Sequence, residues 1–85
     1  MANRRRIAIT DQYQLLSARE CVITIDKAPS NRGSALLISD NDQDDSAAQK
    51  FSTKSVGTQV QNQKRDSVYA KSIGGGQGWE VIVSD

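Results

Sequence analysis

Short runs in which apolar and polar residues alternate recur along the 85-residue chain, and they constrain its fold more than any other feature. A period of two is typical of a β-strand with one buried face. In residues 21–25, Cys21, Ile23 and Ile25 share one face, and the density of β-branched residues favours strand over helix. The same alternation predicts strands over residues 7–10, 56–61, 66–71 and 79–84.

Three other segments complete the predicted fold. Residues 34–39 are a continuous apolar run, which predicts a strand buried on both faces. The glycine-rich residues 74–78 predict a flexible turn between antiparallel neighbouring strands. The best helix candidate is one turn around residues 46–50, with Asp44 or Asp45 as its N-cap. We therefore predict an all-β fold, a small antiparallel β-sandwich or barrel (jelly-roll-like) with at most one short helical turn. The domain boundaries are expected to be residues 1–85, with residues 1–6 as a basic N-terminal arm.

The core of such a domain is expected to be thin. Apolar residues make up 36% of the chain and aromatic residues only 5%, while a chain this short buries only about 60–65% of its unfolded surface. Cys21 is the only cysteine and histidine is absent, so neither an internal disulfide nor a zinc site can add stability. A neighbouring subunit is the remaining support, and we expect a homo-oligomer or a chain that docks on a larger assembly.

The charge balance and the apolar segments limit the compartment and the partners. The formal net charge is +1, which suggests neither nucleic acid nor an anionic membrane as a partner. No secretory segment and no apolar run long enough to span a bilayer is present, and the single cysteine fits a reducing compartment. We expect a protein that is made soluble in the cytoplasm, with no membrane partner.

Catalysis is not expected. Without histidine the chain lacks both the usual general base and the partner of a serine or cysteine nucleophile. The glycine-rich segment is followed by a strand and lacks the lysine of a phosphate-binding loop, so no cofactor is predicted. Trp79 and Tyr69 are predicted to anchor the core, and the alternative for Trp79 is an exposed position where it would be a docking hot spot.

The strongest acidic cluster spans residues 40–45. The spacing of Asp40, Asp42 and Asp44 matches the first three ligand positions of a calcium-binding loop. The match then fails, because Asp45 stands where a glycine is required and Phe51 stands where a glutamate is required. A calcium site of another type and a solvated surface loop both remain open.

The strongest basic cluster is the triplet Arg4, Arg5 and Arg6. It could pair with acidic groups on a protein partner, contact nucleic acid phosphates, or remain a solvated arm. Within one assembly, the arginines of one copy could meet the acidic loop of another copy. We expect the partner contacts to be made by these three arginines together with Asp42, Asp44 and Asp45.

The order of these segments resembles that of small virion proteins of tailed bacteriophages. The similar stretches are Tyr-Gln-Leu-Leu-Ser at residues 13–17, a strand at 20–25, a glycine-marked apolar strand at 33–38 and Val-Gly-Thr-Gln at 56–59. The ending is also similar, with Val-Tyr-Ala-Lys at residues 68–71, the glycine-rich turn, and Gly-Trp-Glu-Val-Ile-Val at 78–83. The resemblance covers most of the chain but includes no chemical motif.

What the resemblance implies is a β-sandwich on the phage particle. The leading hypothesis is a capsid decoration (cement) protein that binds between major capsid protein subunits on the capsid exterior and stabilises the DNA-filled head. The alternative within the particle is a collar, tail, fibre or adaptor component. A hypothesis from a different class is a small nucleic-acid-binding β-barrel, which resembles an OB-fold in size. The resemblance implies no catalytic residues.

Overall fold

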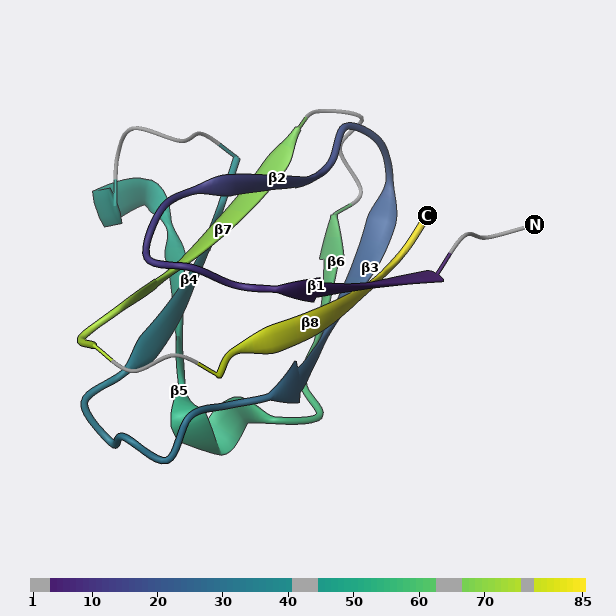
Figure 1. The fold of residues 1–85 in the computed structure, drawn as a ribbon. Coiled ribbons are helices and arrows are strands. Elements are labelled where there is room, and N and C mark those ends of the chain that lie inside the picture. Colours follow the sequence, from purple (N-terminus) through teal and green to yellow (C-terminus); the bar gives the residue numbers. More distant parts are fainter. Residues whose placement is uncertain (1–3, 41–44, 63–66, 76–77) are drawn as a thin grey trace.

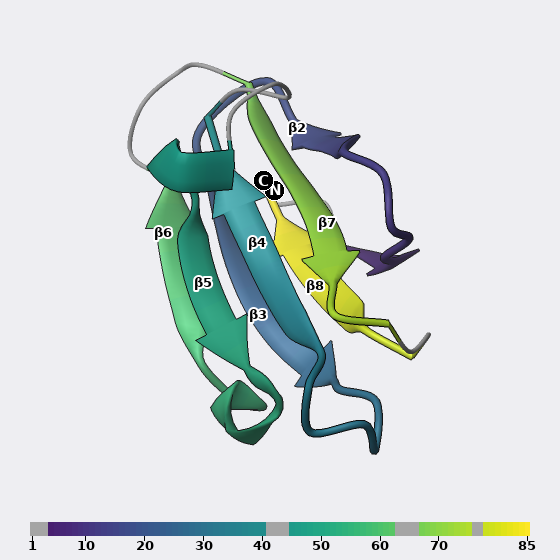
Figure 2. The same cartoon turned by 90° about the vertical axis from the view of Figure 1, so that its left-hand side faces the viewer.

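The computed structural model of the chain describes residues 4–40, 45–62, 67–75 and 78–85. Within them, eight strands form two antiparallel sheets that face each other (Figures 1 and 2), which confirms the predicted all-β, sandwich-like fold. The strands are β1 (Arg4–Ala8), β2 (Gln14–Ser17), β3 (Cys21–Lys27), β4 (Ala35–Ser39), β5 (Gln49–Ser52), β6 (Gln59–Asn62), β7 (Val68–Ile73) and β8 (Glu80–Ser84). Two 3-10 turns, η1 (Asp45–Ala47) and η2 (Thr53–Ser55), flank β5. No helix among the described residues has the length and apolar character that crossing a membrane requires.

The two sheets are joined at a corner between β1 and β2. The first sheet has the strand order β1-β8-β3-β6 and the second has the order β2-β7-β4-β5. At the corner the Ile9 backbone N–H donates to the Trp79 carbonyl at 2.8 Å, which extends the first sheet. The next carbonyl, that of Thr10, accepts from the Ser72 N–H at 2.8 Å, which extends the second sheet. Consecutive residues therefore hydrogen-bond to different sheets.

The core lies between the sheets and follows the predicted alternation. In β3 the residues Cys21, Ile23 and Ile25 are buried, and in β8 the residues Val81 and Val83 are buried. The strand β4 is buried along its whole length, as its continuous apolar sequence predicts. The alternation in β3 and β8 and the apolar run of β4 are thus confirmed as core elements.

Only one of the two aromatic residues predicted to anchor the core does so. Trp79 is 1% exposed, and its indole Nε1 donates to the Ser34 hydroxyl at 2.8 Å. Tyr69 is half-buried and lies between Val68 and Ala70, which both pack in the core. Because side chains alternate along a strand, Tyr69 points to the outer face of the second sheet, and its predicted core position is wrong.

The N-terminal arginines are part of a strand, which corrects the predicted boundary of the basic arm. Arg4, Arg5 and Arg6 pair in register with Ser84, Val83 and Ile82 of β8. The pairing of β1 with β8 therefore holds this stretch in an extended conformation whatever the polarity of its side chains. Residues 1–3 lie outside the described residues.

Other parts of the fold also differ from the predictions. The glycine-rich segment links β7 to β8, which belong to different sheets, so it is a crossover and not a hairpin turn. The predicted helical turn is the shorter η1, which begins at Asp45, and Gln49 and Lys50 belong to β5 instead. The strands β2 and β5 and the turn η2 were not predicted from alternation. Val56, predicted to lie on a strand, is 49% exposed and precedes β6.

Candidate partner-binding surface

Among the described strands, β1 lies at the edge of the first sheet and pairs with β8 alone. Its register places Arg5 opposite Val83, which faces the core, whereas Arg4 and Arg6 lie opposite Ser84 and Ile82. Residues that are directly opposite in an antiparallel pair point to the same face of the sheet. The arginine triplet is therefore divided, with Arg5 on the inner side and the other two on the outer face.

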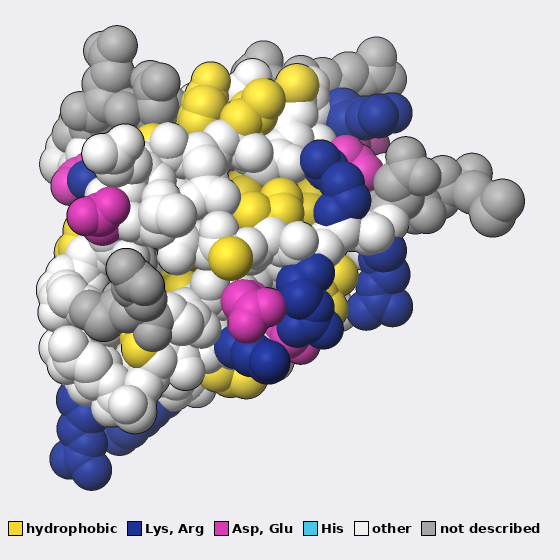
Figure 3. All heavy atoms as spheres, viewed as in Figure 1, with side chains coloured by type: hydrophobic (Ala, Val, Ile, Leu, Met, Phe, Trp, Pro, Cys, Tyr) yellow, Lys and Arg dark blue, Asp and Glu magenta, His cyan; other side chains and the backbone are white. Residues whose placement is uncertain are grey.

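On the outer face, Arg6 belongs to a small network of ion pairs. Its guanidinium contacts the carboxylates of Asp26 and, at 3.6 Å, of Glu80. The Lys27 ammonium lies 3.7 Å from the other carboxylate oxygen of Glu80. Each exposed pair contributes little stability, but a network restricts the orientation of the side chains that form it. Figure 3 shows Lys and Arg side chains gathered where β1 and β8 run, with acidic side chains among them.

On the inner side, Arg5 ties β1 to the second sheet. One guanidinium nitrogen, Nη2, donates to the Leu16 carbonyl at 2.7 Å and to Asp85 Oδ2 at 3.1 Å. The same Asp85 oxygen accepts from the Ser17 hydroxyl at 3.0 Å and lies 3.7 Å from Arg19 Nε. The Asp85 side chain is 5% exposed and that of Arg5 is 48% exposed, so Arg5 stabilises this end of the sandwich while part of its side chain faces solvent.

Arg4 is the least engaged arginine of the triplet. It is exposed and has no ion pair with the described residues. Together with Arg5, Arg6 and Ile82 it lines a shallow hollow of about 270 Å³ on the surface of the first sheet. A positively charged hollow with one aliphatic wall is suited to an acidic group that is carried on an apolar stem.

Asp45, by contrast, is engaged within the chain on the outer face of the second sheet. The Tyr13 hydroxyl donates to Asp45 Oδ1 at 2.7 Å, and the Lys71 ammonium lies 2.9 Å from Asp45 Oδ2. The same ammonium lies 4.8 Å from the centre of the Tyr13 ring. The hydrogen bond from Tyr13, followed by that from Lys71, lowers the pKa of Asp45 below its ordinary value. These contacts attach η1 to β7, which the sequence did not predict.

Two of the acidic residues predicted to contact a partner are not described by the structure. Asp42 and Asp44 lie outside the described residues, so their predicted partner contacts remain predictions. Among the residues described, no group of three or more His, Cys, Asp or Glu side chains could hold a metal ion. The arginines Arg5 and Arg6 pair with Asp85, Asp26 and Glu80, whereas Asp45 pairs with Tyr13 and Lys71, so the described contacts do not join these arginines to Asp45.

Acid titration tests the contacts of Asp45. A carboxyl whose folded-state pKa is lowered stabilises the fold fully above its ordinary value of 3.8, and this contribution is lost as the pH falls through the lower, folded value. We expect an NMR titration to place the Asp45 midpoint below 3.8 and Tyr13→Phe to raise it toward that value. Tyr69→Phe is the control, because it removes a tyrosine hydroxyl at another position on the second sheet. It is expected to leave the Asp45 midpoint unchanged. A wild-type midpoint at or above 3.8 would contradict the assigned contacts.

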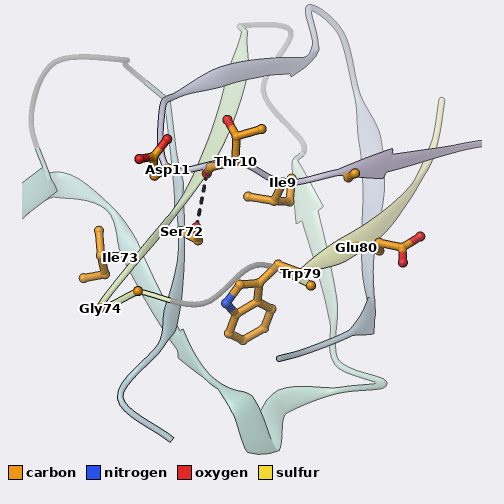
Figure 4. Close-up of a pocket in the computed structure, with 11 residues that line it drawn as sticks. Ile9, Thr10, Asp11, Ser72, Ile73, Gly74, Trp79 and Glu80 are labelled. Atoms are coloured by element: carbon orange, nitrogen blue, oxygen red, sulfur yellow. Dashed lines mark hydrogen bonds between the residues drawn. The ribbon is translucent and has the colours of Figure 1, made fainter. Parts of the chain in front are cut away.

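A second hollow lies at the corner where the chain passes between the sheets (Figure 4). It has a volume of about 530 Å³, and its lining includes Ile9, Asp11 and Trp79. Ile9 and Trp79 are 4% and 1% exposed, so they offer a ligand little apolar surface. Residues 76–77 lie outside the described part of the chain, and we assign no ligand to this hollow.

Cys21 is the strongest nucleophile type in a chain without histidine. It is buried in the core cluster, and desolvation raises the pKa of its thiol despite hydrogen bonds with Ser17 and Asn62 that lower it. Because the thiolate is the reactive form, a raised pKa lowers the reactivity of the sulfur. The surroundings of Cys21 are those of a packing residue.

Comparisons with protein family models, with curated proteins and with solved structures found no match to this chain. Proposals about its function therefore depend on its residues and on the geometry described above. The feature with the most specific chemistry is the edge of the first sheet around Arg4 and Arg6.

Proposed function

We propose that this chain is a binding and assembly protein that docks on a larger protein structure through β1. The observation that carries the proposal is that Arg4 and Arg6 are held on an edge strand, next to the half-buried Ile82 and on the outer face of a sheet. Charges that are fixed on a rigid strand lose less conformational entropy on binding than charges on a solvated arm. Such a surface contributes orientation and specificity, and repetition over many copies adds avidity.

The proposed setting is a tailed-phage virion, and the support for it is the resemblance of the sequence to small virion proteins. In this proposal the chain decorates the capsid exterior and clamps neighbouring major capsid protein subunits. Copies of the chain would adjoin one another on the shell. The alternative setting within the particle is the collar, the tail or a fibre. A thin core suits either setting, because docking stabilises the folded state by mass action.

The number of copies per particle separates these settings. We expect quantitative mass spectrometry of purified particles to give a ratio to the major capsid protein near one, or a simple fraction such as one third. A few copies per particle would move the protein to the collar or tail, and its absence from the particle would overturn the virion proposal. Particles that lack the chain are expected to lose DNA at a lower temperature, and equal heat stability would contradict the clamping role.

A charge reversal tests the role of the β1 surface. Arg4→Glu removes an arginine that has no ion pair with described residues, so the fold is expected to survive while affinity for the assembly falls by about tenfold at low salt. Lys54→Glu is the matched control. Lys54 is an exposed cation on η2, so its substitution changes the net charge by the same amount at a site away from β1. Equal losses for both variants would show a general effect of net charge and would contradict a specific surface.

The nucleic-acid alternative is supported less well by the arrangement of the arginines. Among the three arginines only Arg4 has no ion pair with described residues, whereas a phosphate backbone is bound by several cations along its path. Salt-sensitive binding of oligonucleotides at micromolar protein concentration in a gel-shift titration would revive that alternative.

A further inference from the structure

We propose that the open edge of β1 accepts an extended acidic segment of a partner protein as an additional strand of the first sheet. The inference rests on the proposed function and specifies how the partner is held. It adds backbone hydrogen bonding to the charge contacts of Arg4 and Arg6. The segment would lie beside β1 on the side opposite β8.

The direction of the backbone groups of β1 follows from one hydrogen bond. The Ile9 N–H donates to the Trp79 carbonyl, so the backbone groups of Ile9 face β8. Successive residues of a strand present their N–H and C=O groups to opposite sides. Ile7 and Arg5 therefore also face β8, whereas the backbone groups of Arg4 and Arg6 face the open side.

A side-chain contact agrees with this assignment and marks where the open edge ends. Ala8 lies two residues after Arg6, so its backbone groups face the same side of β1 as those of Arg4 and Arg6. Its carbonyl accepts from the Gln14 side-chain amide at 2.9 Å. Gln14 belongs to β2 of the other sheet, so the Ala8 carbonyl points away from β8. The backbone of Arg4 and Arg6 is thus the part of this edge that is available to a partner.

The regularity of β1 favours it over β2, the edge strand on the same side of the second sheet. The pairing of β1 with β8 runs through five residue pairs without a shift in register. The pairing of β2 with β7 shifts between Leu15 and Ser17, which is the signature of a bulge. Bulges bend a strand and interrupt the spacing of its hydrogen-bonding groups, so they discourage strand addition.

The charges on β1 determine the chemistry of the partner. Residues of an added strand that lie directly opposite Arg4 and Arg6 point to the same outer face. Opposite charges at such positions are favourable and like charges are unfavourable. Acidic residues opposite Arg4 and Arg6 therefore fit this edge. The one opposite Arg4 meets an arginine without an ion pair among the described residues, and the one opposite Arg6 joins a network that already includes Asp26 and Glu80. A second copy of β1 would instead place arginine against arginine. The partner segment is expected to be acidic and to come from a different sequence.

The test uses a short peptide with alternating residues, acetyl-Thr-Glu-Thr-Glu-Thr-Glu-Thr-amide, and two N-methylated versions of it. In an added antiparallel strand, a glutamate opposite Arg6 directs its own N–H toward β1. Methylating the glutamate amides is therefore expected to abolish binding, whereas methylating the threonine amides is expected to leave it within about twofold of the parent. The peptide with lysine in place of glutamate is expected not to bind.

Hydrogen exchange provides an internal control in the same chain. Binding of the parent peptide is expected to slow exchange of the Arg6 amide by about tenfold or more when most of the protein is bound. The Arg5 and Ile7 amides already face β8, so their exchange is expected to change little. Equal protection of Arg5, Arg6 and Ile7 would indicate general stabilisation and would overturn the assigned direction of the strand.

Two variants separate charge from hydrogen bonding at one position. Arg4→Gln removes the charge and keeps the N–H, whereas Arg4→Pro also removes an N–H that faces the open side. Proline is tolerated at the first residue of an edge strand, so the pairing with β8 is expected to survive, which thermal unfolding checks. We expect Arg4→Pro to weaken peptide binding several-fold more than Arg4→Gln does.

The outcomes distinguish this inference from the proposed function. Peptide binding that is indifferent to methylation of the glutamate amides, or no binding at millimolar concentration, would overturn strand addition. Neither result would alter the copy number on particles or the effect of Arg4→Glu on docking. Absence from particles would overturn the virion proposal. Peptide binding that is lost when the glutamate amides are methylated would still support strand addition.

Discussion

Replacing Trp79 with alanine is expected to lower the free energy of unfolding by about 3–5 kcal/mol. The indole is 1% exposed and is the largest of the fully buried side chains among the described residues. Its removal leaves a cavity next to the corner between the sheets and leaves the Ser34 hydroxyl without its donor. Because a small domain has a total stability of about 5–15 kcal/mol, we expect a large fall in the urea midpoint of unfolding.

The control for Trp79→Ala is Tyr69→Ala. Both substitutions remove an aromatic ring, but Tyr69 is half-buried on the outer face of the second sheet, so we expect a loss near the average of about 1 kcal/mol. Trp79→Phe keeps an aromatic ring but removes the indole donor together with part of the buried volume, so its loss is expected to lie between zero and that of Trp79→Ala. A loss for Trp79→Ala no larger than that for Tyr69→Ala would contradict the central position of the indole.

Gly74→Ala is expected to destabilise the fold by about 3 kcal/mol or more, which combines backbone strain with overpacking. The backbone of Gly74 has a φ of +81°, which residues with a β-carbon rarely adopt. An added β-carbon would also lie 2.0 Å from the carbonyl oxygen of Gly33, so one of the two chain segments would have to move. The segment between the sheets is therefore expected to lose its position, with a large decrease in the melting temperature.

Gly57→Ala is the matched control for Gly74→Ala. Gly57 has a φ of +94°, so its substitution produces comparable backbone strain, but an added β-carbon there meets no atom within 4 Å. We expect a loss of about 1–2 kcal/mol, which reflects the strain alone. Equal losses at the two positions would mean that the close approach of Gly74 to Gly33 has no energetic consequence.

The parts of the fold that the sequence predicts are those in which burial determines the residue type. β3 and β8 alternate between the core and the outer face, and their sequences alternate in the same way. β1 was predicted to start only at Ile7, because three arginines in succession show no alternation of polarity. Their extended conformation results from pairing with β8, which lies almost a full chain length away in the sequence. Contacts of this kind are not encoded in local periodicity.

The same reasoning applies to the candidate surface. The sequence indicated Arg4, Arg5, Arg6 and Asp45 as charged groups, but the availability of each depends on its neighbours in space. Arg5 is occupied by Leu16 and Asp85, and Asp45 by Tyr13 and Lys71. Register in β1 follows from its pairing with β8, and the partner of Asp45 on β7 follows from the order of strands in the second sheet. Neither can be derived from the spacing of charges along the chain.

The corner at Ile9 and Thr10 has a mechanical consequence for a chain that is held by β1. An edge strand that is pulled sideways ordinarily detaches by unzipping, with its hydrogen bonds breaking one after another. Here Ile9 and Thr10 anchor one end of β1 to both sheets, while Arg5 anchors the other end to Leu16 of β2. A sideways load on β1 is therefore divided between the two sheets from its first displacement, and the strand cannot peel away from β8 without also straining the second sheet.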